Sequence, residues 1–200
     1  MKNHSPQSPA KKGLEQIPPP PKQISARPIS KARQIQQSQE QALVNLPANT
    51  LYIGLWVRDD PPPVNDFHWA FYHHHGGHGG KMYQVKGLGE GWITDHGQTG
   101  CIFKSLFLGC LIQIASIDEG RTGELDRVIE SLDSELNEIP GVTCRVWLFE
   151  VLPRLVEAGF FTCRDPQALQ TECLELGNGI RIEASRNLQP RPVFTVTSAS

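Results

Sequence analysis

The sequence predicts an α+β fold in which an antiparallel sheet packs against two or three helices. Between residues 50 and 117, short segments rich in β-branched, aromatic and aliphatic residues alternate with Gly- and Pro-rich stretches, which is typical of strands joined by turns. Between residues 122 and 176, apolar residues recur at helical spacing instead. Strands followed by helices indicate a single α+β domain, and a chain of 200 residues suits one domain with tails.

The chain divides into three parts by composition. We expect residues 1–47 to form a disordered, basic, Pro- and Gln-rich arm, residues 48–186 a single globular domain, and residues 187–200 a loose C-terminal tail. The arm contains PPPP at 18–21 and QIQQSQEQ at 34–41, and it offers little apolar surface for burial. A PPPPK segment can bind an SH3-like domain as a polyproline II helix, so the arm is a candidate binding site for a protein partner.

The strands are expected in the first half of the domain. TLYIGLWV at 50–57 is β-branched and aromatic, and it ends at the stretch RDDPPPVND. FHWAFY at 67–72 and KMYQVK at 81–86 predict a hairpin across a Gly-rich loop. GWIT at 91–94 predicts a short strand nearby. SLFLGCLIQIASI at 105–117 is a long apolar run, which predicts a strand buried on both faces.

Two of the expected helices carry clear start signals. Thr122 is a suitable N-cap for a helix over 122–137, in which leucine, valine and isoleucine recur at helical spacing. Asp165 followed by Pro166 is a typical N-cap and first helical residue, and it predicts a helix to at least residue 176.

A third helix is expected between these two. Thr143 is a plausible N-cap, and the apolar pattern predicts a helix over 144–156. Pro153 lies in its interior, where proline removes a backbone hydrogen bond and clashes with the preceding turn. We therefore expect a kink or an early end at that position.

The distribution of charge argues against nucleic-acid binding. Residues 1–47 carry seven basic and two acidic residues, whereas the rest of the chain carries 12 basic and 19 acidic residues. The domain has no basic stripe with interleaved aromatic side chains, which a nucleic-acid interface needs. We interpret the basic arm as a solubilising segment.

Composition also bears on the compartment. No apolar run approaches the roughly 18 residues of a membrane span, and the N-terminal segment MKNHSPQSPAKKGLEQ has no apolar core of a secretory signal. The five cysteines are odd in number and include no CxxC pair, which argues against a disulfide framework. We therefore expect a cytoplasmic protein with reduced thiols and no membrane span.

The segment FHWAFYHHHGGHGGKMYQVK at 67–86 raises the question of a metal site, because it contains His73, His74, His75 and His78 close together. A zinc site needs about four ligands held in tetrahedral geometry, and the surrounding glycines provide no rigid framework. We expect an exposed loop with no physiological metal or cofactor. A metal-binding role for this loop remains the weakest of the functional alternatives.

A different set of residues suits nucleophilic catalysis. On an extended strand, His68 shares a face with Ala70 and Tyr72, and a hairpin can place it beside Gln84. Cys144 is expected at the start of a helix, where the helix dipole and free N–H groups stabilise a thiolate. A histidine can accept the thiol proton, and a side-chain amide can fix its tautomer.

These segments invite comparison with a known family. HWAFY and KMYQV resemble the histidine strand and the following strand of NlpC/P60-type papain-like hydrolases, and TCRVW at 143–147 resembles their nucleophile segment. The resemblance implies Cys144 as nucleophile, His68 as base and Gln84 as the residue that orients the base. Histidine precedes cysteine here, as in the circularly permuted branch with lecithin:retinol acyltransferase-like and PPPDE-type proteins. The chain also resembles a group of small uncharacterised fungal proteins with HWA and CxxW segments.

Some features depart from that family pattern. Arg145 follows the cysteine where a small residue is usual, Gln84 stands in place of a more usual histidine, and the loop between the two strands is long. The leading hypothesis is a cysteine-dependent hydrolase or acyltransferase that acts on an amide, ester or thioester of a small molecule or peptide. The alternative is a non-catalytic binding or interaction module on the same fold.

Overall fold

A six-stranded sheet forms the centre of the protein in a computed structural model, which describes residue 1 and residues 30–199. The expected α+β class is confirmed, and the strand order is β6-β3-β2-β1-β7-β8. Every neighbouring pair is antiparallel except β7 and β8, so the sheet is mixed. The strands of this sheet are β1 Thr50–Val57, β2 Phe67–Gly76, β3 Gly79–Tyr83, β6 Gly97–Thr99, β7 Leu108–Ser116 and β8 Val193–Thr195.

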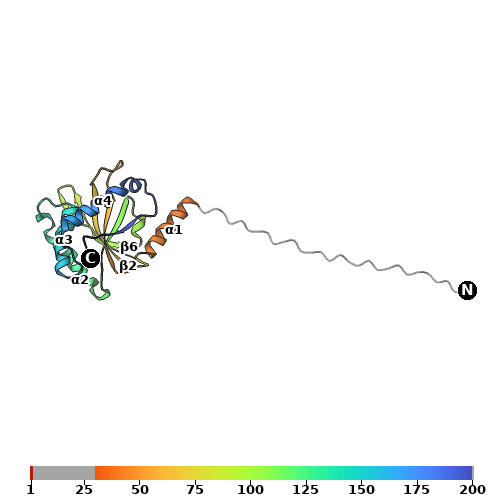
Figure 1. Ribbon diagram of the computed structural model, residues 1–200, viewed down its shortest axis with the longest axis horizontal. Helices are drawn as coiled ribbons and strands as arrows, with labels where there is room; N and C mark the ends of the chain where they lie inside the picture. Colours follow the sequence, from red (N-terminus) through yellow and green to blue (C-terminus); the bar gives the residue numbers. More distant parts are fainter. Residues whose placement is uncertain (2–29, 200) are drawn as a thin grey trace.

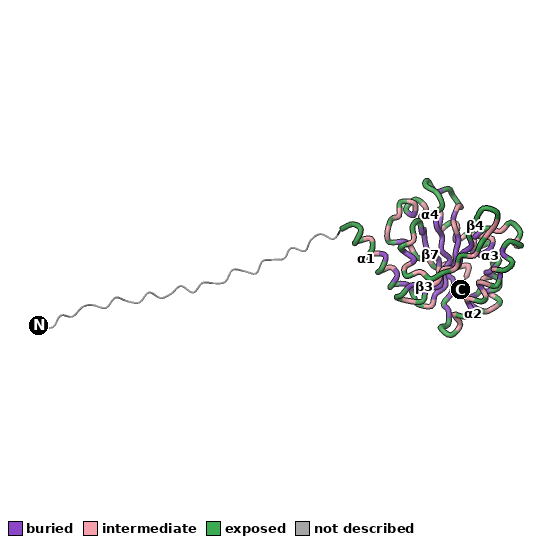
Figure 2. The backbone as a smooth tube through the Cα atoms, turned by 180° about the vertical axis from the view of Figure 1, so that it is seen from behind, coloured by how far each residue is buried: buried purple, intermediate pink, exposed green. Residues whose placement is uncertain are grey.

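Helices cover both faces of the sheet (Figure 1). One face packs against α2 Thr122–Ile129, α3 Cys144–Glu157 and α4 Pro166–Ser185, and this side contains the larger apolar core. The other face packs against α1 Lys31–Val44 and the short 3-10 helix Ile102–Lys104. The central strand β1 is buried along its whole length, because its alternating side chains enter both cores. Figure 2 shows the buried part of the backbone in the middle of the domain, around β7, the neighbour of β1 in the sheet.

The helix α1 corrects the expected disordered arm over residues 1–47. Ser30 caps the helix by accepting a hydrogen bond from the Arg33 backbone N–H at 3.4 Å. Leu43 and Leu46 are buried beside Phe103 in the smaller core, on the face of the sheet that α1 covers; we call this the outer core. The composition of the arm concealed this helix because only its last turn and the residues just after it contribute apolar side chains to the core. The Pro-rich segment at 18–21 lies outside the described residues.

The C-terminal segment is also more ordered than the loose tail expected over 187–200. The strand β8 pairs in parallel with β7, and Phe194 packs against the larger core. Glu172 on α4 accepts hydrogen bonds from the backbone N–H groups of Thr197 and Ser198 at 3.0 and 3.2 Å. These contacts fix the segment on the edge of the sheet.

The β2–β3 hairpin confirms the expected strand pair but corrects the expected loop. The strand β2 continues to Gly76, so His73 and His74 lie inside it and are fully buried. They pair with β1 on one side and with β3 on the other, which leaves only His75 and His78 exposed at the turn. The polar composition of the segment was therefore misleading about its position in the sheet.

A small second sheet lies beside the main one. It is the hairpin of β4 Val85–Leu88 and β5 Gly91–Thr94, and it matches the expected short strand near GWIT. The residue Gln84 lies between β3 and β4, where the chain leaves the main sheet.

The helices largely follow the sequence pattern. The helix α2 ends at Ile129 and continues as a 3-10 helix over Glu130–Glu138, and α3 continues through Pro153 without the expected early end. The helix α4 extends beyond residue 176 to Ser185. Its Gly177 packs so closely that an added Cβ would lie 2.9 Å from Leu55. Within residues 30–199, no helix has the length and apolar character needed to cross a membrane.

Candidate active site

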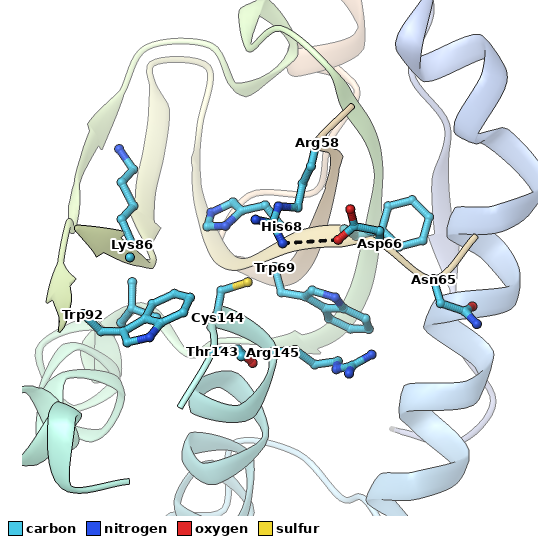
Figure 3. Close-up of a pocket in the computed structure, with 13 residues that line it drawn as sticks. Arg58, Asn65, Asp66, His68, Trp69, Lys86, Trp92, Thr143, Cys144 and Arg145 are labelled. Carbon is cyan, nitrogen blue, oxygen red and sulfur yellow. Dashed lines mark hydrogen bonds and ion pairs between the residues drawn. The ribbon is translucent and has the colours of Figure 1, made fainter. Parts of the chain in front are cut away.

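A cavity of about 410 Å³ lies where the start of β2, the start of α3 and the β4–β5 hairpin meet (Figure 3). Its wall contains both predicted reactive residues, Cys144 and His68. The residues that line it are Arg58, Asn65, Asp66, Phe67, His68, Trp69, Val85, Lys86, Gly87, Trp92, Thr143, Cys144 and Arg145.

Cys144 is the first residue of α3. The Thr143 hydroxyl accepts a hydrogen bond from the Val146 backbone N–H at 3.1 Å, so the helix begins where the sequence predicts. Trp147 anchors this turn in the core by an edge contact with Phe71, with ring centroids 5.9 Å apart. In Figure 3 the Cys144 side chain projects from the helix end toward the strand that carries His68. The residue is 6% exposed, and its position at the start of the helix places it beside the free N–H groups of the first turn.

His68 lies on β2 and shares a face of the strand with Ala70 and Tyr72 of the outer core, whereas Cys144 packs in the larger core on the other face. Its Nε2 lies 2.8 Å from the Gln84 Oε1, and the Trp56 ring packs 5.9 Å from its own ring. An amide oxygen only accepts hydrogen bonds, so Nε2 carries the proton and donates to Gln84. The Nδ1 atom is therefore unprotonated and can accept a proton.

Gln84 is held on three sides. Its backbone N–H donates to the Nδ1 of His96 at 3.1 Å, and its backbone oxygen accepts from the Asp95 N–H at 2.9 Å. Its side-chain Nε2 donates to the Asp95 carboxylate at 2.8 Å, and Asp95 forms an ion pair with Lys86. Because Asp95 accepts from the amide nitrogen, the amide oxygen is directed at His68, which fixes the histidine tautomer.

The surroundings of His68 keep its ring neutral. Burial lowers the pKa of His68, and the positive charges of Lys86 and Arg58 act in the same direction. The hydrogen bond to Gln84 and the charge of Asp95 oppose this shift. Since the pKa falls below the ordinary value near 6.5, the imidazole is uncharged at neutral pH and is available as a base.

Asp95 is the member of this network that the sequence analysis missed. The β4–β5 register pairs Val85 with Thr94, so the preceding and following residues, Gln84 and Asp95, come to lie opposite each other. The turn signal GLGEG at 87–91 could have given this register, because it marks the centre of the hairpin.

The histidine-rich segment does not assemble a ligand set. His73 and His74 point to opposite faces of the sheet, as successive strand residues must, and His74 accepts or donates a hydrogen bond at 2.9 Å with the Tyr72 hydroxyl. Among the residues that the structure describes, no group of three or more His, Cys, Asp or Glu side chains could hold a metal ion.

Comparisons with known proteins assign no family to this arrangement. No protein-family model, curated protein sequence or solved structure matched the chain. The geometry of the cavity and the chemistry of its lining residues are therefore the basis for assigning a function.

Proposed function

We propose that the chain is a cysteine-dependent hydrolase or acyltransferase that acts on an amide, ester or thioester. Cys144 is the nucleophile, His68 the base and Gln84 the residue that orients the base. One observation carries the proposal: His68 uses Nε2 to bind Gln84 at 2.8 Å, which leaves Nδ1 unprotonated, and His68 and Cys144 both line the same cavity. This is the division of roles that thiol activation by an oriented imidazole requires.

The proposed reaction has two halves. His68 takes the proton of Cys144, the sulfur bonds to the carbonyl carbon, and the backbone N–H of Cys144 stabilises the oxyanion. The oxyanion then collapses, the bond to the leaving group breaks, and His68 returns the proton to the departing nitrogen, oxygen or sulfur. Water or another acceptor next attacks the thioester, gives its proton to His68, and releases the acyl group so that the thiol is restored.

The family resemblance supports the same assignment. The permuted order of histidine and cysteine and the cysteine at a helix start match NlpC/P60-type expectations, and Gln84, just after the second strand of the pair, takes the position of the more usual histidine. A permuted papain-like core is therefore part of the proposal. The five cysteines are free thiols, which suits a reducing cytoplasmic location.

A second candidate function is a non-catalytic binding module on the same fold. The low exposure of Cys144, 6%, favours it, because a thiol sealed from solvent does not react with a substrate. The two functions differ in one property, the reactivity of this thiol at neutral pH.

Alkylation with iodoacetamide, followed by mass spectrometry of peptides, measures that reactivity for all five cysteines in one sample. We expect Cys144 to react faster than the half-buried Cys101 and Cys163, which serve as internal controls. Replacing the base in His68→Gln should slow the reaction of Cys144 by about 100-fold, in the range of general-base effects. Reaction of Cys144 no faster than the two controls would exclude the catalytic function and leave the binding module.

A further inference from the structure

The cavity is basic although the domain around it is acidic. Residues 48–200 carry 12 basic and 19 acidic side chains. The wall of the cavity reverses this ratio, with Arg58, Lys86 and Arg145 against a single carboxylate, Asp66. Such a local reversal of charge concentrates anions at a cavity within an otherwise acidic surface.

Two of the three cations are compensated by neighbours. The Nη1 of Arg58 lies 3.2 Å from the Asp66 carboxylate, and Lys86 forms an ion pair with Asp95. Arg145 is half-buried and has no hydrogen bond or ion pair with another residue in the described part of the chain. The cavity therefore contains one positive charge that no carboxylate within residues 30–199 balances.

The position of Arg145 gives no benefit to the helix that carries it. The residue follows Cys144 in the first turn of α3, where the helix dipole disfavours a positive charge. Figure 3 shows its side chain running beneath Trp69, along the wall that starts at the Cys144 helix end. A half-buried cation without a partner among the described residues, on the wall of the cavity that Cys144 also lines, is suited to bind an anion.

We propose that the cavity binds acyl substrates with a carboxylate close to the reacting carbonyl, and that Arg145 binds this carboxylate. The inference rests on the proposed function, since it names the substrate class of the same site. A single uncompensated positive charge matches a carboxylate, whereas a phosphate monoester carries about −1.5 to −2 at neutral pH. The planar guanidinium also matches the two oxygens of a carboxylate.

Two alkylating agents that differ in one group test this inference. Iodoacetate carries a carboxylate, and iodoacetamide carries a neutral amide; both form an S–C bond with Cys144 and release iodide. We expect Arg145→Gln to slow the reaction of Cys144 with iodoacetate by about 10-fold, in keeping with the loss of a charge-assisted contact of about 1.4 kcal/mol. The rate with iodoacetamide should change by less than about 2-fold.

Two control variants show whether an effect of Arg145→Gln comes from lost carboxylate binding, from the change in net charge or from altered folding. Arg154→Gln, on the same helix but outside the cavity, makes the same change in charge and should leave both rates unaltered. Arg145→Lys keeps the charge and should retain most of the preference for iodoacetate.

The possible outcomes are distinct. In one outcome, Cys144 of the unaltered protein reacts fast with iodoacetamide, but Arg145→Gln slows both reagents equally or slows neither. That result overturns the carboxylate inference and leaves the thiol chemistry intact. Slow reaction of Cys144 with both reagents in the unaltered protein overturns the proposed function, and the inference that rests on it fails with it.

Discussion

Histidines show most clearly how position determines chemistry in this chain. His68 and His73 lie five residues apart on one strand, and burial lowers the pKa of both. His68 has Gln84 as a partner for one ring nitrogen, whereas neither ring nitrogen of His73 has a hydrogen-bond partner in the described residues. We therefore assign a reactive role to His68 and a structural role to His73, with consequences for stability in acid.

The first prediction concerns this acid sensitivity. Burial lowers the pKa of His73 to about 4, below the value near 6.5 expected in the unfolded chain. Between these values the unfolded state binds a proton that the folded state does not, so the free energy of unfolding falls as the pH decreases from about 6.5 to about 4. His73→Leu should reduce this loss by up to about 1.4 kcal/mol per pH unit, measured by urea unfolding at several pH values.

A matched substitution at the same hairpin provides the control. His78 is exposed at the turn, so His78→Leu should leave the pH dependence of unfolding as it is in the unaltered protein. Equal pH dependence in all three proteins would contradict the assignment of an uncharged, buried His73.

At the scale of elements, the site depends on how one strand ends and a hairpin begins. The sequence predicted the start of α3 at Cys144, because a Thr143 N-cap is a local signal, and it predicted the strand pair that brings Gln84 to His68. It did not predict Asp95, because this contact depends on the register of the β4–β5 hairpin. The helix α1 and the buried His73 and His74 were also missed, since their burial is decided by tertiary packing that overrides polar composition.

The second prediction concerns the support that this hairpin gives to the base. Asp95→Ala removes the acceptor that holds the Gln84 amide, so the amide can rotate and the His68 tautomer is no longer fixed. We expect alkylation of Cys144 by iodoacetamide to slow by about 10-fold, the lower end of effects seen for residues that orient a ligand or base.

A conservative substitution at the same position distinguishes a loss of His68 positioning from a loss of folding. Asp95→Asn retains an oxygen that can accept from the Gln84 amide, and it should restore most of the rate. Asp59→Ala removes an exposed carboxylate from a nearby loop and should have no effect. If Asn and Ala at position 95 slow the reaction equally, the hydrogen bond is not what positions the base.

At the scale of the whole molecule, the sheet separates two apolar cores, one on each of its faces. Cys144 lies on the face packed by α2, α3 and α4, whereas His68 lies beside Trp56 on the face closed by α1 and the Ile102–Lys104 helix, and both residues line the same cavity. Apolar side chains of β1 contribute to both cores, so the two faces share the stability of one domain. We expect a change under α1 to alter stability while leaving the reactivity of Cys144 unaltered, because no residue of α1 lines the cavity.

The third prediction tests this separation with two neighbouring residues of α1. Leu43 is 5% exposed in the outer core, and Val44 beside it is 66% exposed. Leu43→Ala should lower the free energy of unfolding by about 2 kcal/mol or more, the range for truncating a buried leucine, whereas Val44→Ala should change it by less than about 0.5 kcal/mol. Urea unfolding measures both effects, and iodoacetamide labelling below the transition should show an unchanged rate at Cys144. Equal stability of the two variants would mean that α1 does not pack on the sheet and that Leu43 is not part of the outer core.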